Sequence, residues 1–285
     1  MALFSPSESP AVVVKEIDLT NGVANVPTST GAFVGNFNWG PCDEPTLVNN
    51  EAKLANVFGS PDTTNTVDFH SAAYYLRYSD DLYIVREYTA TAKNAYDPSV
   101  DSTNVPLITN SDNFDGQVAA RESDSHTFIA KYPGELGNSL KISVTGAGDT
   151  SYDSWQYKAN FDAQPETSSW CVGIDSAGAT QSNSTIKDEA HVVVIDEGGK
   201  ITGTQGTILE TFPFVSMALG AKTSDGTSSY IKNVINTQSK YVWMAGFNNK
   251  YGANAGTAAT TTSDYTSGFT ADVNLSLVGG ANSEL

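Results

Sequence analysis

The sequence predicts a mixed α/β fold of the α+β kind, in which strands outnumber a few short helices. Three observations indicate it. Short runs rich in β-branched and aromatic residues recur along the 285-residue chain, glycine and proline separate many of these runs, and helical spacing of apolar residues is confined to brief segments. The sequence shows no repeat at a fixed period, so a repeat architecture is not expected.

Two strands are indicated most clearly by their residue patterns. Residues 82 to 86 form an apolar run that is typical of a buried strand, and residues 140 to 144 alternate between apolar and polar side chains. A β-hairpin is predicted around residues 196 to 200, because its two glycines can supply positive φ angles at the turn. Other strands are expected at residues 11–16, 30–37, 46–48, 126–130, 191–195, 203–212, 241–244 and 272–278.

Three helices are predicted from cap residues and apolar spacing. The side chain of Asn49 or Asn50 can cap a helix that runs through Val57 and ends at a glycine. Residues 66 to 78 and residues 228 to 237 carry apolar side chains at helical spacing, so each is expected to form a short helix.

The chain is expected to divide into an extended N-terminal arm, residues 1 to 20, and a body domain, residues 21 to 285. Prolines near the start keep the arm extended, and the strand it contains needs a sheet edge, either in its own domain or in a neighbouring subunit. Two segments without regular patterning, residues 96 to 116 and 146 to 189, are expected to be surface excursions of the body.

The charge of the chain excludes some classes of partner. The formal net charge is −17 at pH 7, with 15 basic and 32 acidic residues, whereas nucleic acids and anionic membrane surfaces require basic patches. We interpret the acidity as solubility through self-repulsion. The N-terminus has no basic region followed by an apolar stretch, and no run of 18 apolar residues occurs, so neither a signal peptide nor a membrane span is expected.

Motifs that carry chemistry are scarce, which favours a structural or binding role. Cys42 and Cys171 are interpreted as unpaired thiols, and the histidines His70, His126 and His191 as ordinary surface or core residues. The sequence contains no G-x-S-x-G, no H-x-x-x-H, no C-x-x-C and no complete phosphate-binding loop. No enzyme activity, metal or cofactor is therefore expected.

Short motifs occur in a fixed order over nearly the whole chain. They are Phe4-Ser5-Pro6, residues 10–16, residues 27–32, Val34-Gly35, Trp39-Gly40-Pro41, residues 58–61, residues 74–78, residues 82–86, residues 132–138, residues 229–231, residues 239–242 and residues 277–280. In the order and spacing of these motifs, the chain resembles the contractile tail sheath family of myovirus phages, which is related to the sheaths of phage-tail-like bacteriocins.

The resemblance implies structural roles for two groups of residues. An inter-subunit arm would contain Pro10, Val12, Val13, Val14, Lys15 and Glu16, and the structural motifs of the family would be represented by Trp39, Gly40, Pro41, Tyr132, Pro133, Gly134, Glu135 and Gly137. It also implies a strand-rich sheath body, and it assigns residues 96 to 116 to the place where larger sheaths insert an outer domain.

The function implied by the resemblance is that of a structural subunit of a contractile tail sheath. Such subunits polymerise as helical rings around the tail tube and contract to drive the tube through the host envelope. The implied partners are other copies of the chain and the tail tube and baseplate proteins. The implied location is the virion tail, after assembly in the host cytoplasm.

The chain departs from the family pattern at two places. Ala11 stands where the opening motif of the family has glycine. Family members continue beyond the Gly279-Gly280 motif with a further α/β region and a tube-facing C-terminal domain, and we expect that portion to be absent from a chain that ends at Leu285.

Two other classes of function are kept as alternatives. A β-rich surface or virion binding module, such as an adhesin, would agree with the abundance of Thr, Ser and Asn, but as a secreted protein it would require a signal peptide. A hydrolase with a cryptic site is disfavoured by the scarcity of chemical motifs.

Overall fold

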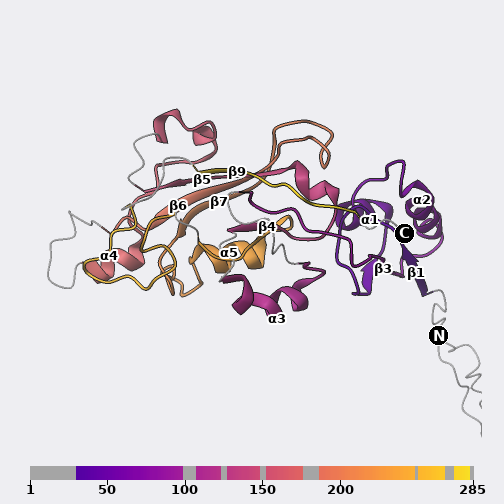
Figure 1. Cartoon of the computed structure of the whole chain (residues 1–285), viewed down its shortest axis with the longest axis horizontal. Helices are drawn as coiled ribbons and strands as arrows, with labels where there is room; N and C mark the ends of the chain where they lie inside the picture. The colour runs from indigo at the N-terminus through magenta and orange to yellow at the C-terminus, as the bar shows by residue number, and fades with distance from the viewer. Residues whose placement is uncertain are drawn as a thin grey trace, which may run out of the picture.

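The computed structural model describes residues 30–98, 107–122, 127–147, 152–175, 186–247, 250–266 and 273–282. These residues form an elongated body with a large lobe and a small lobe, and the N-terminal side of the described chain enters at the small lobe (Figure 1). Both lobes combine strands with short helices, so the predicted mixed α/β class is confirmed. The N-terminal arm, including its expected strand at 11–16, lies outside the described residues.

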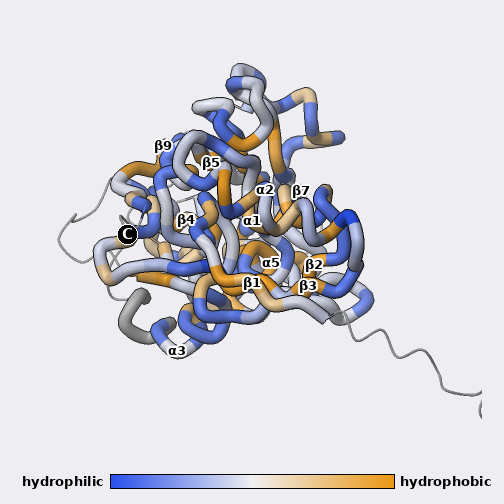
Figure 2. Tube along the Cα trace, turned by 90° about the vertical axis from the view of Figure 1, so that its right-hand side faces the viewer, coloured by the Kyte–Doolittle hydropathy of each residue, from blue (hydrophilic) through white to orange (hydrophobic). Residues whose placement is uncertain are grey.

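The small lobe is a three-stranded sheet with two helices on one face. Its strands are β1 (Gly31–Gly35), β2 (Thr46–Val48) and β3 (Leu82–Arg86), in the order β1-β3-β2, with β1 parallel and β2 antiparallel to β3. The helices α1 (Glu51–Phe58) and α2 (Thr66–Tyr75) share a buried core with the sheet. In Figure 2 the strands of this lobe are hydrophobic segments bordered by hydrophilic loops.

The two predicted helices of the small lobe are present. Asn50 caps α1, since its side-chain oxygen accepts a hydrogen bond of 2.8 Å from the backbone N–H of Lys53, and Gly59 ends the helix with a φ of 82°. Helix α2 ends at Tyr75 rather than at residue 78, because the backbone N–H of Tyr78 bonds to the carbonyl of Tyr75 in a tight turn.

The large lobe is organised by a four-stranded antiparallel sheet in the order β7-β6-β5-β9. Its strands are β5 (Leu140–Gly146), β6 (Glu189–Asp196), β7 (Thr207–Ser216) and β9 (Val273–Ser276). A second pair, β4 (Phe128–Ala130) and β8 (Val242–Met244), and helix α5 (Ile231–Gln238) contribute to the main core on one face of the sheet. Strand β6 is buried over most of its length, because aromatic side chains of residues 152 to 157 cover its other face.

The expectation of two surface excursions is wrong in part. Residues 111 to 122 form helix α3 (Ser111–Glu122), and the side chain of Phe114 stacks on Trp243 with ring centroids 4.3 Å apart. Ile108 and Phe114 are both buried, so this part of the first segment belongs to the core. Residues 99–106 of the same segment lie outside the described residues.

The second segment also contributes to the core. It contains the short 3₁₀ helices η4 (Tyr152–Ser154) and η5 (Lys158–Asn160) and the helix α4 (Ser169–Asp175). Its aromatic side chains Tyr152, Trp155 and Tyr157 are buried against Val193 and Ile195 of β6. The aromatic residues of the segment were the signal in the sequence for this packing. The helices could not be predicted, because polar residues separate the apolar ones and no helical spacing results.

The β6–β7 connection is longer than predicted and is held by one carboxylate. Strand β6 ends at Asp196 and β7 begins at Thr207, and in the connection between them Gly199 has a φ of 70°. Asp196 accepts hydrogen bonds from the Ser139 hydroxyl, from the backbone N–H groups of Ile201 and Thr202, and from the Thr202 hydroxyl. Burial by itself raises the pKa of the Asp196 carboxyl, but these hydrogen bonds outweigh burial and hold the pKa below its ordinary value.

We predict that Asp196→Asn lowers the free energy of unfolding by about 3 kcal/mol at pH 7, because several hydrogen bonds to a charged acceptor are weakened or lost. Since the folded-state pKa lies below the ordinary value of 3.8, the contribution is complete above that value and is lost as pH falls through the folded-state pKa. Urea unfolding of both proteins at pH 7 and pH 3 measures the difference, which should shrink at the lower pH.

The neighbouring Glu197→Gln is the matched control. Glu197 makes a partly exposed ion pair with Lys141 at 3.3 Å, so its loss should cost below about 1 kcal/mol. Equal destabilisation by the two variants would contradict the role given to Asp196.

Candidate functional site: a junction around Arg86

The two lobes meet around a single buried guanidinium. Arg86 is the last residue of β3 and is 3% exposed. Its Nε donates to the carbonyl of Phe37 at 2.7 Å, its Nη1 to the carbonyl of Gly40 at 3.0 Å, and its Nη2 to the carbonyl of Pro133 at 2.8 Å. Phe37 and Gly40 belong to the small lobe, whereas Pro133 precedes β5 of the large lobe, so one side chain bonds to both.

The charge of Arg86 is balanced by backbone dipoles rather than by an acid. In the described part of the chain the ion pairs are formed by Lys141 and Lys158, and neither involves Arg86. Burial lowers the pKa of Arg86, and the neighbouring Cys42 opposes that shift. An arginine nevertheless stays protonated in proteins, and its planar fork can direct several N–H donors at fixed carbonyls.

The Trp39-Gly40-Pro41 motif supplies one wall of this junction. Gly40 has a φ of 98°, and a Cβ atom there would lie 2.7 Å from the carbonyl oxygen of Val57, so glycine is required on both counts. The indole of Trp39 packs edge-on against the ring of Tyr132, with centroids 5.4 Å apart. The motif therefore turns the chain tightly enough to aim the Gly40 carbonyl at Arg86.

The motif at residues 132 to 137 supplies the opposite wall. Gly134 has a φ of 138°, and its N–H donates to the carbonyl of Lys93 at 3.0 Å. Gly137 lies in the 3₁₀ helix η3 (Glu135–Ser139), where a Cβ atom would meet Ala95 and Ala130 at under 3 Å. Burial raises the pKa of the Tyr132 phenol to about 12, with smaller contributions from nearby charged groups.

The Gly279-Gly280 motif closes the junction from the C-terminal side. Asn138 and Gly280 bond reciprocally, with Nδ2 donating to the Gly280 carbonyl at 2.8 Å and Oδ1 accepting from the Gly280 N–H at 2.7 Å. The side-chain oxygen of Asn282 accepts from the N–H of Glu135 at 2.9 Å. A Cβ atom on Gly280 would lie 2.4 Å from the carbonyl oxygen of Gly134, so only glycine allows this approach.

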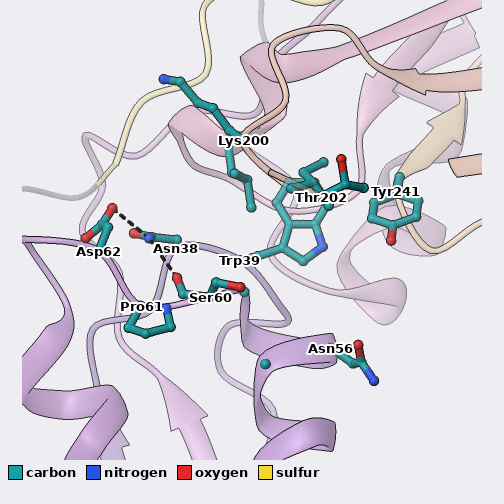
Figure 3. A pocket seen from close by; sticks show the side chains of 13 residues that line it. Asn38, Trp39, Asn56, Ser60, Pro61, Asp62, Lys200, Thr202 and Tyr241 are labelled. Carbon is teal, nitrogen blue, oxygen red and sulfur yellow. Dashed lines mark hydrogen bonds between the residues drawn. The ribbon is translucent and has the colours of Figure 1, made fainter. Parts of the chain in front are cut away.

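A cavity of about 520 Å³ lies beside the junction (Figure 3). Asn38, Trp39 and Tyr241 line it together with residues of α1 and of the β6–β7 connection. Its acid, Asp62, already accepts hydrogen bonds from Asn38, Thr64 and Asn65, and these hold the pKa of Asp62 low although burial acts in the opposite direction. The hydroxyl of Thr202, which also lines the cavity, donates to Asp196, so these polar side chains already have partners within the protein.

The structure thus brings together the predicted motif residues from distant parts of the sequence. Trp39, Gly40 and Pro41 lie opposite Tyr132, Pro133 and Gly134, while Glu135 bonds to Asn282 near the C-terminal end and Gly137 lies against Ala95 and Ala130. The six arm residues Pro10, Val12, Val13, Val14, Lys15 and Glu16 lie outside the described part of the chain. The functional role of each of these residues stays a prediction.

The other candidate residues of the sequence remain apart. Cys42 and Cys171 are both buried and unpaired, as interpreted. His70 is exposed on α2, His191 is buried in β6, and His126 lies outside the described residues. Where the chain is described, no three His, Cys, Asp or Glu side chains gather closely enough to hold a metal ion. None of the described helices is long and apolar enough to cross a membrane.

Sequence reasoning missed the role of Arg86. The pattern of residues 82 to 86 predicted a buried strand, but it gave no hydrogen-bond partners for the buried guanidinium at its end. An arginine that ends an apolar strand was the available signal, but its acceptors are carbonyls 46 to 49 residues away, and carbonyls leave no mark in a sequence.

We predict that Arg86→Lys lowers the free energy of unfolding by about 3 kcal/mol, because one ammonium group cannot bond to all three carbonyls and leaves buried acceptors unpaired. The exposed Arg77→Lys is the matched control and should change stability by less than about 0.5 kcal/mol. Urea unfolding followed by far-UV circular dichroism measures both values. Equal stability of the Arg86 variant and the wild type would refute the role of the fork.

Comparison with known proteins identifies relatives of the chain. No protein-family model matches it. The tail sheath protein of Salmonella phage ViI is 30% identical over 209 residues, which cover 73% of this chain and 29% of that protein. The tail sheath proteins of enterobacteria phage T4 and Vibrio phage KVP40 are 43% identical over 89 residues and 39% identical over 88 residues, in each case 30% of this chain and 13% of the relative.

A solved sheath tail protein from Listeria innocua aligns with 90% of this chain and 34% of its own length, at 14% identity and a TM-score of 0.41. The chain spans less than a third of the length of the phage sheath proteins that it matches. The sequence matches to three phage sheath proteins agree with the motif resemblance, and the chain belongs to the tail sheath protein family of phages.

Proposed function

We propose that the chain is part of a subunit of a contractile phage tail sheath, which polymerises as helical rings around the tail tube and contracts to drive the tube through the host envelope. The observation that supports this most is the match to three phage tail sheath proteins, one of which extends over 73% of the chain. Membership of this family implies a location in the virion tail. Assembly would take place in the host cytoplasm.

The junction around Arg86 suits such a role. A sheath that contracts must transmit force through its subunits, and a body whose lobes could separate would absorb that force. Arg86, the Trp39–Tyr132 contact and the Asn138–Gly280 pair tie together segments up to 142 residues apart in sequence. These contacts support the proposal that the body moves as one unit while the contacts between subunits rearrange.

The proposed partners are other copies of the subunit and the tail tube and baseplate proteins. Self-association of so acidic a chain needs specific contacts, because a net charge of −17 opposes nonspecific association. We propose that residues 10 to 16 pair as a strand with a neighbouring subunit. Backbone hydrogen bonds of this kind are independent of side-chain packing and can persist while the rest of the interface changes.

We predict that deleting residues 1 to 18 from a complete sheath polypeptide that contains this sequence abolishes tubes, while the folded body keeps its melting temperature. The reason is that the donated strand is lost and no core residue of the described body is touched. Negative-stain electron microscopy measures tube formation, and circular dichroism measures the melting temperature.

Deleting only residues 2 to 8 is the matched control, since it removes the start of the arm and keeps Pro10 to Glu16. That variant should still form tubes. Normal tubes from the longer deletion would show that the arm does not join subunits.

A further inference from the structure

His191 is the third residue of β6 and faces an aromatic cluster on the outer face of the sheet. Its ring stacks on Phe161 with centroids 4.2 Å apart and an interplanar angle of 7°, and it meets the ring of Phe214 edge-on at 4.6 Å. Trp155 lies behind it, with ring centroids 6.5 Å apart. The imidazole is therefore enclosed between residues 152–167, which we call the covering loop, and strand β7.

The hydrogen bonds of the ring define its protonation state. Nε2 lies 2.8 Å from the carbonyl oxygen of Ala163, which can only accept, so Nε2 carries a proton. Nδ1 lies 3.0 Å from the backbone nitrogen of Phe214, which can only donate, so Nδ1 carries none. The ring is thus the neutral Nε2–H tautomer, and it connects the covering loop to β7 with one bond on each side.

The backbone N–H of Phe214 has the His191 Nδ1 atom as its hydrogen-bond partner. Phe214 has a φ of 50°, a left-handed conformation that costs energy in a residue with a Cβ atom. The pairing of β6 with β7 shifts register between Ala190 and Val192, so His191 sits at the irregularity where the Phe214 N–H turns away from the ladder. The imidazole nitrogen satisfies the N–H that this distortion would otherwise leave without a partner.

Few charged groups lie on the surrounding elements to stabilise an imidazolium. On the covering loop Lys158 pairs with Asp153, and Asp162 and Glu166 are exposed. On β6 the Glu189 carboxylate accepts from the N–H of Glu166. Tyr152 contacts His191 through its ring, with centroids 6.3 Å apart, and β5 and β7 place Thr145 and Phe214 beside it.

We propose that His191 is an acid-sensitive contact that holds the covering loop against the sheet and releases it when the imidazole is protonated. Protonation adds a hydrogen to Nδ1, which then faces the Phe214 N–H donor to donor, so the bond to β7 is lost. The positive charge would also lie among aromatic rings in a buried site. Release exposes the aromatic face of the cluster formed by Tyr152, Trp155 and Tyr157.

The direction of the pH dependence follows from the burial of the ring. Burial lowers the pKa of His191, and the backbone groups of Ala163 and Ala190 oppose that shift only in part. The closed loop therefore binds a proton less readily than the open loop. Its stability is complete above the ordinary value of 6.5 and falls as pH drops below it, so the open fraction grows about tenfold for each pH unit until the closed-state pKa is reached.

The test uses the whole chain with ¹⁵N-labelled histidine and 5-fluorotryptophan. Nitrogen shifts report the tautomer and the titration midpoint of His191, and the ¹⁹F resonance of Trp155 reports the covering loop. We expect the Nε2–H tautomer at pH 8, a midpoint below 6.5, and a change at Trp155 with the same midpoint. Trp243, which packs in a different cluster with Phe114, should not change over this range.

His191→Asn keeps an acceptor near the Phe214 N–H and cannot be protonated, so it should abolish the acid change at Trp155. The exposed His70→Gln is the matched control and should leave that change intact. An Nδ1–H tautomer, a His191 titration without a change at Trp155, or an acid change that survives in His191→Asn would each overturn the proposal. If His191→Asn does not fold, the tautomer and the coincidence of the two midpoints in the wild type decide it.

Discussion

The described structure depends on how one buried cation is satisfied. Arg86 enters the interior without a carboxylate partner, and its burial is tolerable only because three carbonyls from both lobes point at it. Those carbonyls can converge only if the chain turns tightly at Gly40 and Gly134, both of which have positive φ angles. Gly40, Gly134 and Gly280 are thus explained by geometry, since a Cβ atom on any of them would meet a backbone carbonyl oxygen at 3.0 Å or less.

In the large lobe, side chains cover both faces of the four-stranded sheet, and the polar groups buried there also have hydrogen-bond partners. Val192 and Val194 of β6 contribute to the main core, while His191, Val193 and Ile195 face the aromatic residues of the covering loop. Polar groups enclosed there are satisfied individually, as Trp155 Nε1 donates to Ser143 Oγ at 2.9 Å and Asp196 gathers the β6–β7 connection. The family is structural rather than enzymatic. In this chain, the buried polar side chains of Ser143 and Asp196 hold neighbouring groups in place by hydrogen bonds.

Much of the fold could be predicted from the sequence, and the failures have physical causes. The strand at residues 82 to 86 and the Asn50 cap were predictable because burial and capping leave local patterns. Helix α3 was missed because its residues are mostly polar, and because the side chain of Phe114 packs against Trp243, which is distant in the sequence. The motifs of the site, residues 82 to 86 among them, were found by resemblance, but the role of Arg86 was not, since its carbonyl acceptors depend on three-dimensional geometry alone.

If the Arg86 junction holds the two lobes together, they unfold as one cooperative body. Native-state hydrogen exchange tests it most directly, because it reports a free energy of opening for each backbone amide. We expect the slowest amides of β3 in the small lobe and of β5 in the large lobe to exchange with the same free energy, equal to that of global unfolding. A clearly lower value for β3 would show that the small lobe opens independently and that the junction does not unite the lobes.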